Sequence, residues 1–73
     1  MFKPGDVVCL KSDKNTKMTV RSIIDTNIKN RTLEQEPYIL GGACDGDVLC
    51  DFVYQNKLQR SYYKPIQLEL IDW

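Results

Sequence analysis

The chain has 73 residues, with ten basic and ten acidic side chains and no histidine. A chain of this size forms one domain, here residues 1–73, and buries only about 60% of the surface that it exposes when unfolded. Balanced charge excludes long-range attraction to nucleic acid or to an anionic membrane, and the lack of histidine removes the usual general base near neutral pH.

The first strand is predicted at about residues 5–11. A Pro-Gly-Asp turn at residues 4–6 leads directly into an apolar run rich in valine, which favours extended structure. Gly5 permits the turn, and the side chain of Asp6 is expected to cap backbone N–H groups there. Polar residues 12–16 then predict a turn, because Ser, Asp and Asn side chains bond to their own backbone.

The second strand is predicted to begin near Lys17. Met18 and Val20 share one face of this strand, and Thr19, Arg21 and Ile23 share the other. The alternation breaks at Ile23-Ile24, and a bulge near Ser22 would explain the break.

Residues 26–46 form a long connection between the second and third strands. Residues 31–36 favour a helical turn that Pro37 would limit, and Tyr38-Ile39-Leu40 favours a short strand paired with Ile23-Ile24. Because a structureless loop of this length is unusual, we expect a protruding excursion or hairpin whose apolar residues dock on the sheet.

The third strand, at about residues 46–54, has the clearest alternation, with Val48, Cys50 and Phe52 on its inner face. Gln55-Asn56 predicts a tight turn, since asparagine tolerates positive φ.

A fourth strand is expected at residues 57–63. Pro65 prevents the strand from continuing, because proline has no N–H group to donate to the ladder. Residues 65–67 fit a 3₁₀ turn, and residues 68–71 fit a short last strand that pairs with the first. This order predicts an all-β fold, a small SH3-like barrel of about five strands.

The three cysteines are predicted to be free thiols in a reducing compartment, with Cys9 and Cys50 buried and Cys44 exposed. No secretion signal follows Met1, and no apolar run approaches the roughly 20 residues of a membrane span. We therefore expect a cytoplasmic protein that does not bind membranes.

No catalytic, cofactor-binding or metal-binding residue is predicted. Asp45, Asp47 and Asp51 lack the remaining ligands of an EF-hand loop, and Gly41-Gly42 lacks the lysine of a phosphate-binding loop. The prediction is a non-enzyme without a cofactor.

A binding module for an unidentified protein partner is the preferred function, because small barrels expose aromatic residues that hold peptides or bases. One alternative is nucleic-acid binding through basic residues of the first two strands. A second is a homo-oligomer, such as a homodimer, formed through Tyr38-Ile39-Leu40 or the neighbouring edge. Packing is the competing explanation for the aromatic residues, with Tyr62 or Tyr63 turned inward and Trp73 over the open end of the barrel. The candidate binding residues are Lys11, Lys14, Lys17, Arg21, Tyr54, Arg60, Tyr62, Tyr63 and Trp73, of which the first four carry the nucleic-acid alternative.

The two ends of the chain together resemble the YodC-like family of small bacterial proteins, for which no activity is established. The segments that carry the resemblance are Phe2 to Val8, Leu10 to Ser12, Met18 to Val20, Val48 to Val53, Lys57-Leu58, and Pro65 with Leu68 to Leu70. The resemblance implies an SH3-like barrel. The chain departs from the family in a longer segment 26–45, in Phe52 where the family often has tryptophan, and in Asp13-Lys14-Asn15 where the family has a glycine-rich turn.

A weaker resemblance links the opening Gly5-Asp6 and the following basic turn to the KOW module of ribosomal and transcription-elongation proteins. In that module the basic turn lies against RNA or a polymerase. Turn chemistry at Gly5 and Asp6 explains the same residues without a ligand.

Overall fold

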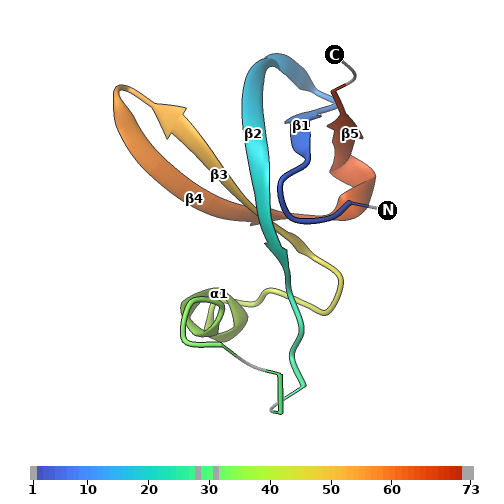
Figure 1. Cartoon of the computed structure of the whole chain (residues 1–73), viewed down its shortest axis with the longest axis vertical. Helices are drawn as coiled ribbons and strands as arrows, with labels where there is room; N and C mark the ends of the chain where they lie inside the picture. Colours follow the sequence, from blue (N-terminus) through green and yellow to red (C-terminus); the bar gives the residue numbers. More distant parts are fainter. Residues whose placement is uncertain (1, 28, 31, 72–73) are drawn as a thin grey trace.

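The structure is a computed structural model that describes residues 2–27, 29–30 and 32–71. Its five antiparallel strands form one sheet in the order β4-β3-β2-β1-β5 (Figure 1). The strands are β1 Val7–Leu10, β2 Asp13–Ile23, β3 Val48–Tyr54, β4 Lys57–Tyr63 and β5 Leu68–Leu70. A 3₁₀ turn, Pro65–Gln67, precedes β5, and a short helix, α1 Glu36–Leu40, lies in the long connection between β2 and β3. The predicted all-β fold of about five strands is confirmed, including the pairing of the last strand with the first.

The turn before β1 is held by the residues that the sequence indicated. Gly5 has a φ of 93°, which L side chains rarely adopt, and an Asp6 carboxylate oxygen accepts a hydrogen bond from the Lys3 backbone N–H at 3.0 Å. The Val20 N–H donates to the Asp6 carbonyl at 2.8 Å, so the turn is fixed against β2.

The connection between β1 and β2 is shorter than predicted, because β2 begins at Asp13 and not near Lys17. Cys9 is paired with Lys17, but the next residue, Leu10, is paired with Asp13, so the register shifts between Cys9 and Leu10. The Asp13 carboxylate accepts hydrogen bonds from the Asn15 N–H at 3.1 Å and from the Thr16 hydroxyl at 3.0 Å. The expected side-chain bonds to local backbone are therefore present, but they form inside the strand.

The predicted bulge at Ser22 is confirmed by a shift in the β2–β3 register between Val20 and Ser22. Beyond the bulge, Ile23 packs against one core cluster and Ile24 belongs to a second. The bulge thus lets two neighbouring isoleucines enter different parts of the core, which explains the broken alternation.

Two apolar clusters make up the core. The larger consists of Val8, Met18, Val20, Val48, Cys50 and Leu68, and the smaller of Ile24, Ala43 and Leu49. Leu49 faces away from the larger cluster, yet it is 0% exposed because Tyr38, Ile39 and Tyr62 pack around the smaller one. Phe52 was expected inside, but it is only half-buried at the margin of the larger cluster.

The long connection forms a helix where a strand was predicted. Tyr38 and Leu40 lie in α1, and Pro37 lies in its first turn, where its missing N–H leaves no helical hydrogen bond unmade. The predicted strand at Tyr38-Ile39-Leu40 is therefore wrong, as is the idea that Pro37 ends a helical turn. Of the segment predicted to form that turn, Arg31 lies outside the described residues.

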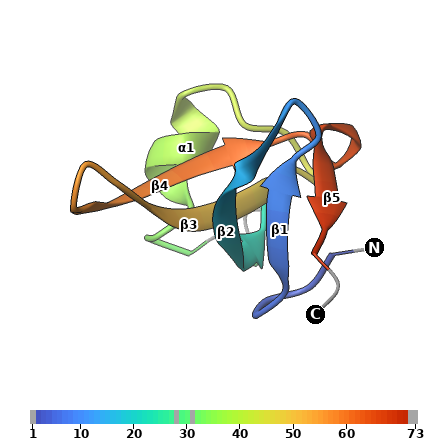
Figure 2. The same ribbon diagram turned by 90° about the horizontal axis from the view of Figure 1, so that it is seen from above.

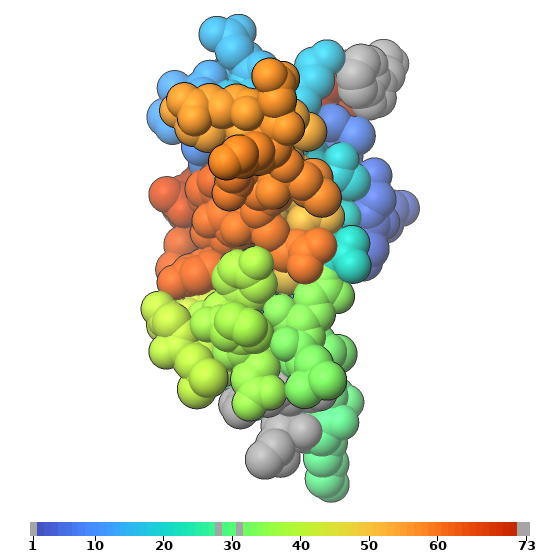
Figure 3. Space-filling model, turned by 90° about the vertical axis from the view of Figure 1, so that its left-hand side faces the viewer, coloured from blue at the N-terminus to red at the C-terminus, as the bar shows by residue number. Residues whose placement is uncertain are grey.

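A buried glutamine anchors this helix to the sheet. The Gln35 amide nitrogen donates to the Ser22 hydroxyl at 3.0 Å and to the Ile23 carbonyl at 3.1 Å, while its oxygen accepts from the Asp25 N–H at 3.1 Å. The helix and its flanking loops cover one end of the molecule in the space-filling view (Figure 3).

The β3–β4 turn adopts the predicted tight geometry, with φ of 51° at Gln55 and 63° at Asn56. Positive φ at both central positions matches the twist of the flanking strands. Within the described residues, no helix has the length and apolar character that a membrane crossing requires.

Candidate interaction cleft

The lysines of the predicted basic surface lie on the β1–β2 hairpin. Lys11, Lys14 and Lys17 are all exposed, and the Lys14 ammonium lies 3.3 Å from a Glu69 carboxylate oxygen. The first hairpin therefore carries three cations close together in sequence, one of them paired with β5.

The two arginines of the predicted surface belong to a network of four charges. The Arg60 Nε lies 2.6 Å from an Asp51 oxygen, and the Arg60 Nη1 lies 3.2 Å from Glu34. Arg21 contacts Glu34 as well, and its Nη1 lies 3.5 Å from Asp51. The hydrogen bond to Asp51 raises the pKa of Arg60. The four charges cancel, and Glu34 joins the long connection to the sheet.

The predicted aromatic residues divide into packed and exposed side chains. Tyr62 meets Tyr38 edge to face, with ring centres 6.2 Å apart, and its hydroxyl donates to the Gly41 carbonyl at 3.2 Å. Tyr63 packs against the larger core cluster, whereas Tyr54 is exposed at the end of β3. Trp73 lies outside the described residues.

The three aspartates considered for a cation site serve separate purposes. Asp45 accepts a hydrogen bond from the Thr26 N–H at 2.5 Å, and bonding to Thr26 lowers the pKa of Asp45. Asp47, which is 2% exposed, lies 3.0 Å from the Lys64 ammonium, and this contact raises the pKa of Lys64. Asp51 binds the arginines. Among residues 2–27, 29–30 and 32–71, no three His, Cys, Asp or Glu side chains gather closely enough to hold a metal ion.

The cysteines lie as predicted, and their reactivity follows from their burial. Cys9 and Cys50 are buried, and Cys44 is exposed. Burial raises the pKa of Cys50 to about 11, so its thiol stays protonated near neutral pH. We expect a thiol-specific reagent to modify one cysteine quickly in the folded protein and all three after denaturation. Rapid modification at two or three sites without denaturant would contradict this assignment, and peptide mass mapping identifies the site.

A cleft opens where two hairpins separate. The β2–β3 ladder ends at Thr19 with Asp51. Beyond that pair β2 stays with β1, while β3 stays with β4 as far as Tyr54 with Lys57. The two hairpins diverge in both ribbon views (Figures 1 and 2). Between them lies a cavity of about 380 Å³.

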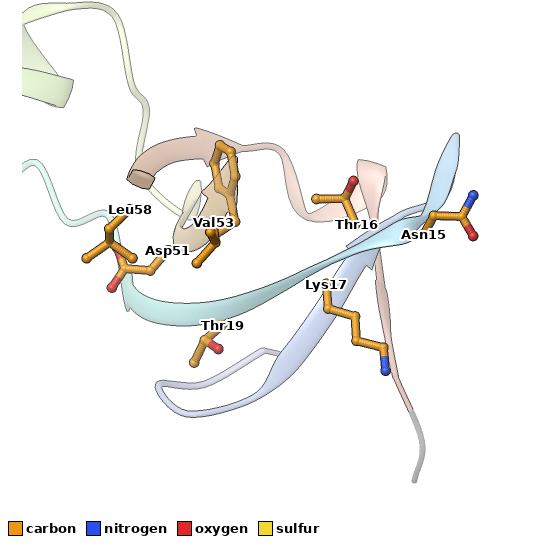
Figure 4. A pocket seen from close by; sticks show the side chains of 8 residues that line it. Asn15, Thr16, Lys17, Thr19, Asp51, Val53 and Leu58 are labelled. Atoms are coloured by element: carbon orange, nitrogen blue, oxygen red, sulfur yellow. The ribbon is translucent and has the colours of Figure 1, made fainter. Parts of the chain in front are cut away.

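Both walls of this cleft are visible in Figure 4, where Asp51, Val53 and Leu58 lie on one side and residues 15–17 follow the other. Val53 and Leu58 are directly paired across the β3–β4 ladder and are 66% and 71% exposed. The described residues that line the cleft are Asn15, Thr16, Lys17, Thr19, Asp51, Phe52, Val53 and Leu58. Sequence reasoning identified Lys17 in this set but did not identify Val53 and Leu58 as binding residues, although apolar side chains on an outward strand face were the available signal.

No family model, curated protein or solved structure matches the chain. The function must therefore be inferred from the geometry of the chain itself.

A second cavity of about 490 Å³ lies beside the 3₁₀ turn. Phe2, Ile23, Val48, Pro65 and Ile66 line it together with Gly46, and Lys17 and the arginines take no part. Its lining is apolar, so it offers little to orient a ligand.

Proposed function

We propose that the chain is a non-catalytic protein-interaction module, built on an SH3-like barrel, whose partner binds in the cleft between the β1–β2 and β3–β4 hairpins. One observation carries the proposal: Val53 and Leu58 lie largely exposed beside a cavity of about 380 Å³. A small domain has few apolar residues to spare for solvent, and exposed apolar side chains beside a concavity are typical of an interface.

The charges favour a protein partner over nucleic acid. Phosphate recognition relies on arginine and lysine, but Arg21 and Arg60 are both paired with the carboxylates of Glu34 and Asp51. Asp51 also lines the cleft, where a carboxylate repels a phosphate backbone. On the first hairpin, Lys14 is likewise paired with the carboxylate of Glu69.

Two further parts of the proposal come from the sequence. The order of strands and the 3₁₀ turn before β5 support the SH3-like description and agree with a YodC-like relationship. A cytoplasmic site of action is also part of the proposal, because free cysteines are typical of a reducing compartment.

Site-directed photo-crosslinking tests the proposed surface. A photoreactive phenylalanine analogue at position 58 should yield discrete protein adducts in an extract of the native cell. The matched control places the analogue at position 40, because Leu40 is 77% exposed but lies on α1, away from the cleft lining. Adducts from position 58 should disappear when Val53 is also changed to lysine, a substitution at an exposed site.

Two results would contradict the proposal. Equal adducts from positions 58 and 40 would mean that the cleft is not a preferred contact. Salt-sensitive binding of an RNA or DNA oligomer that is lost in the double variant Lys14→Glu and Lys17→Glu would favour the nucleic-acid alternative.

A further inference from the structure

We propose that the free edge of β4 pairs with the same edge of a second copy of this chain, so that two sheets join across a two-fold axis at Arg60. β4 is the outermost strand of its sheet, and it is paired with β3 from Lys57 to Tyr63 without a shift in register. The proposal goes beyond the interaction function and does not depend on it, because the cleft opens at the opposite edge of β3, toward β2.

The register shows which backbone groups of β4 point out of the sheet. In an antiparallel strand, the N–H and C=O groups of alternate residues point to the same edge. Val20 hydrogen-bonds with the turn at residues 5–6, so the backbone groups of Thr19 point to β3, where Thr19 is paired with Asp51. Those of Asp51 therefore face β2, and those of Arg60, its partner on β4, face away from the sheet.

The same alternation turns the backbone groups of Leu58 and Tyr62 outward. Lys64 comes next in this series, and its N–H already donates to the Gln67 side chain at 3.0 Å. Among the residues that the structure describes, no group hydrogen-bonds to the outward N–H and C=O of Leu58, Arg60 or Tyr62. β4 also contains neither a proline nor a bulge, and it lies at the surface (orange) above the green long connection in Figure 3. This edge therefore has donors and acceptors for a further strand.

A second copy fits this edge because β4 is complementary to itself. An antiparallel pairing centred on Arg60 aligns the whole of β4 with the same strand of the other copy. Leu58 then lies opposite Tyr62 of the second copy, and Gln59 lies opposite Ser61 of the second copy. An exposed leucine thus packs on an aromatic ring and an amide meets a hydroxyl, both of which are favourable cross-strand pairs.

The charges at the axis also favour a second copy. Arg60 lies opposite itself in this pairing, and two uncompensated like charges would oppose it. However, the Nε of Arg60 lies 2.6 Å from Asp51, and its Nη1 lies 3.2 Å from Glu34. Each copy thus brings two carboxylates to the axis together with its arginine. A strand of an unrelated protein has this charge complementarity only if it carries its own acidic groups there.

Amide hydrogen exchange at increasing protein concentration tests the proposal on the unaltered chain. Between about 10 µM and about 1 mM, exchange at Leu58, Arg60 and Tyr62 should slow by about fourfold or more, as expected for a dissociation constant of about 100 µM or below. The N–H groups of Gln59 and Ser61 face β3 in each copy, so their exchange should not depend on concentration.

A proline substitution tests the same edge in sedimentation equilibrium. Leu58→Pro removes an outward N–H without removing a bond to β3, and it should weaken dimerisation by at least about tenfold. Leu70→Pro is the matched control. Leu70 is an exposed leucine on β5 at the opposite edge, and its N–H also points outward because the N–H of Ile71, next in the chain, bonds to Val7. This control should leave dimerisation unchanged.

Two results would overturn the proposal: a chain that is monomeric at about 1 mM, or a dimer that does not slow exchange at the three outward amides. If Leu58→Pro does not fold, as thermal melting will show, the exchange experiment still decides. Crosslinking at position 58 separates this proposal from the interaction function, since an adduct of two copies differs in mass from an adduct with another protein. If concentrated chain gave no adduct of two copies while the cell extract gave a selective adduct, only the pairing of β4 would be wrong.

Discussion

Replacing Leu49 by alanine should lower the free energy of unfolding by about 2–5 kcal/mol, since it empties a fully buried position in a small core. The substitution should mainly weaken the packing of the long connection, including α1, against the sheet. Leu49 lies in the cluster with Ile24 and Ala43, against which Tyr38 and Ile39 pack. Amide hydrogen exchange should therefore increase more in α1 than in β1 and β5, and urea denaturation measures the overall loss.

The matched control is Leu40→Ala, because Leu40 belongs to the same helix but is 77% exposed. Its effect on unfolding should stay within about 0.5 kcal/mol. A loss below about 1 kcal/mol for Leu49→Ala would show that α1 does not seal this second cluster.

Replacing Lys64 by methionine should lower the free energy of unfolding at neutral pH, because it leaves the buried carboxylate of Asp47 without its cation. The only other contact to this carboxylate found among the described residues is the Cys44 N–H, which donates to it at 2.9 Å. Methionine keeps most of the length and apolar stem of lysine, so the lost charge dominates the effect.

The pH dependence of this variant has a definite sign. The hydrogen bond to Asp47 raises the pKa of Lys64 in the folded protein above its unfolded value. The contact therefore stabilises the fold fully below the unfolded pKa of about 10.4, and this stabilisation is lost as the pH rises through the higher folded pKa. Denaturation of both proteins near about pH 7 and above about pH 11 should show a smaller stability deficit of the variant at the higher pH.

Lys57→Met is the control, since Lys57 is an exposed lysine at the β3–β4 turn, and it should change stability by no more than about 0.5 kcal/mol. If Lys64→Met lost the same free energy of unfolding at both pH values, the charge of Lys64 beside Asp47 would not be the source of the stabilisation.

The strands could be predicted from sequence where local chemistry decides the structure. Gly5 and Asp6 specify the first turn, Gln55-Asn56 accepts positive φ, and Pro65 ends β4 before the 3₁₀ turn. The bulge at Ser22 was also readable, because two adjacent isoleucines cannot both continue one alternating face.

The long connection could not be predicted because its structure depends on distant partners. Tyr38-Ile39-Leu40 has the composition of a strand, but five helical residues form once Gln35 bonds to Ser22 and Ile23 across the chain. For the same reason the sequence places Leu49 on the outer face of β3. The helix that covers Leu49 belongs to the long connection, whose structure could not be predicted. Tertiary contacts here override local preference.

The candidate site was predicted only in part. Lys17 was recognised from its charge, but Arg21 and Arg60 were assigned to a binding surface without their partners Glu34 and Asp51. The contacts of Glu34 with Arg21 and Arg60 join residues far apart in the sequence, so spacing alone does not reveal them. The predicted turn at Gln55-Asn56, in contrast, already places Asp51 opposite Arg60. The cleft itself exists because the β2–β3 ladder stops at Thr19 and Asp51, a property of sheet twist that no single residue encodes.

A protein partner that binds between the two hairpins must contact both of them. Backbone amide NMR shifts on titration with the protein captured by crosslinking at position 58 measure this contact. We expect shifts on both walls, at residues 15–19 of β2 and 51–54 of β3, with little change in α1. Shifts confined to one wall, or centred on α1 or on the cavity beside Pro65, would contradict it.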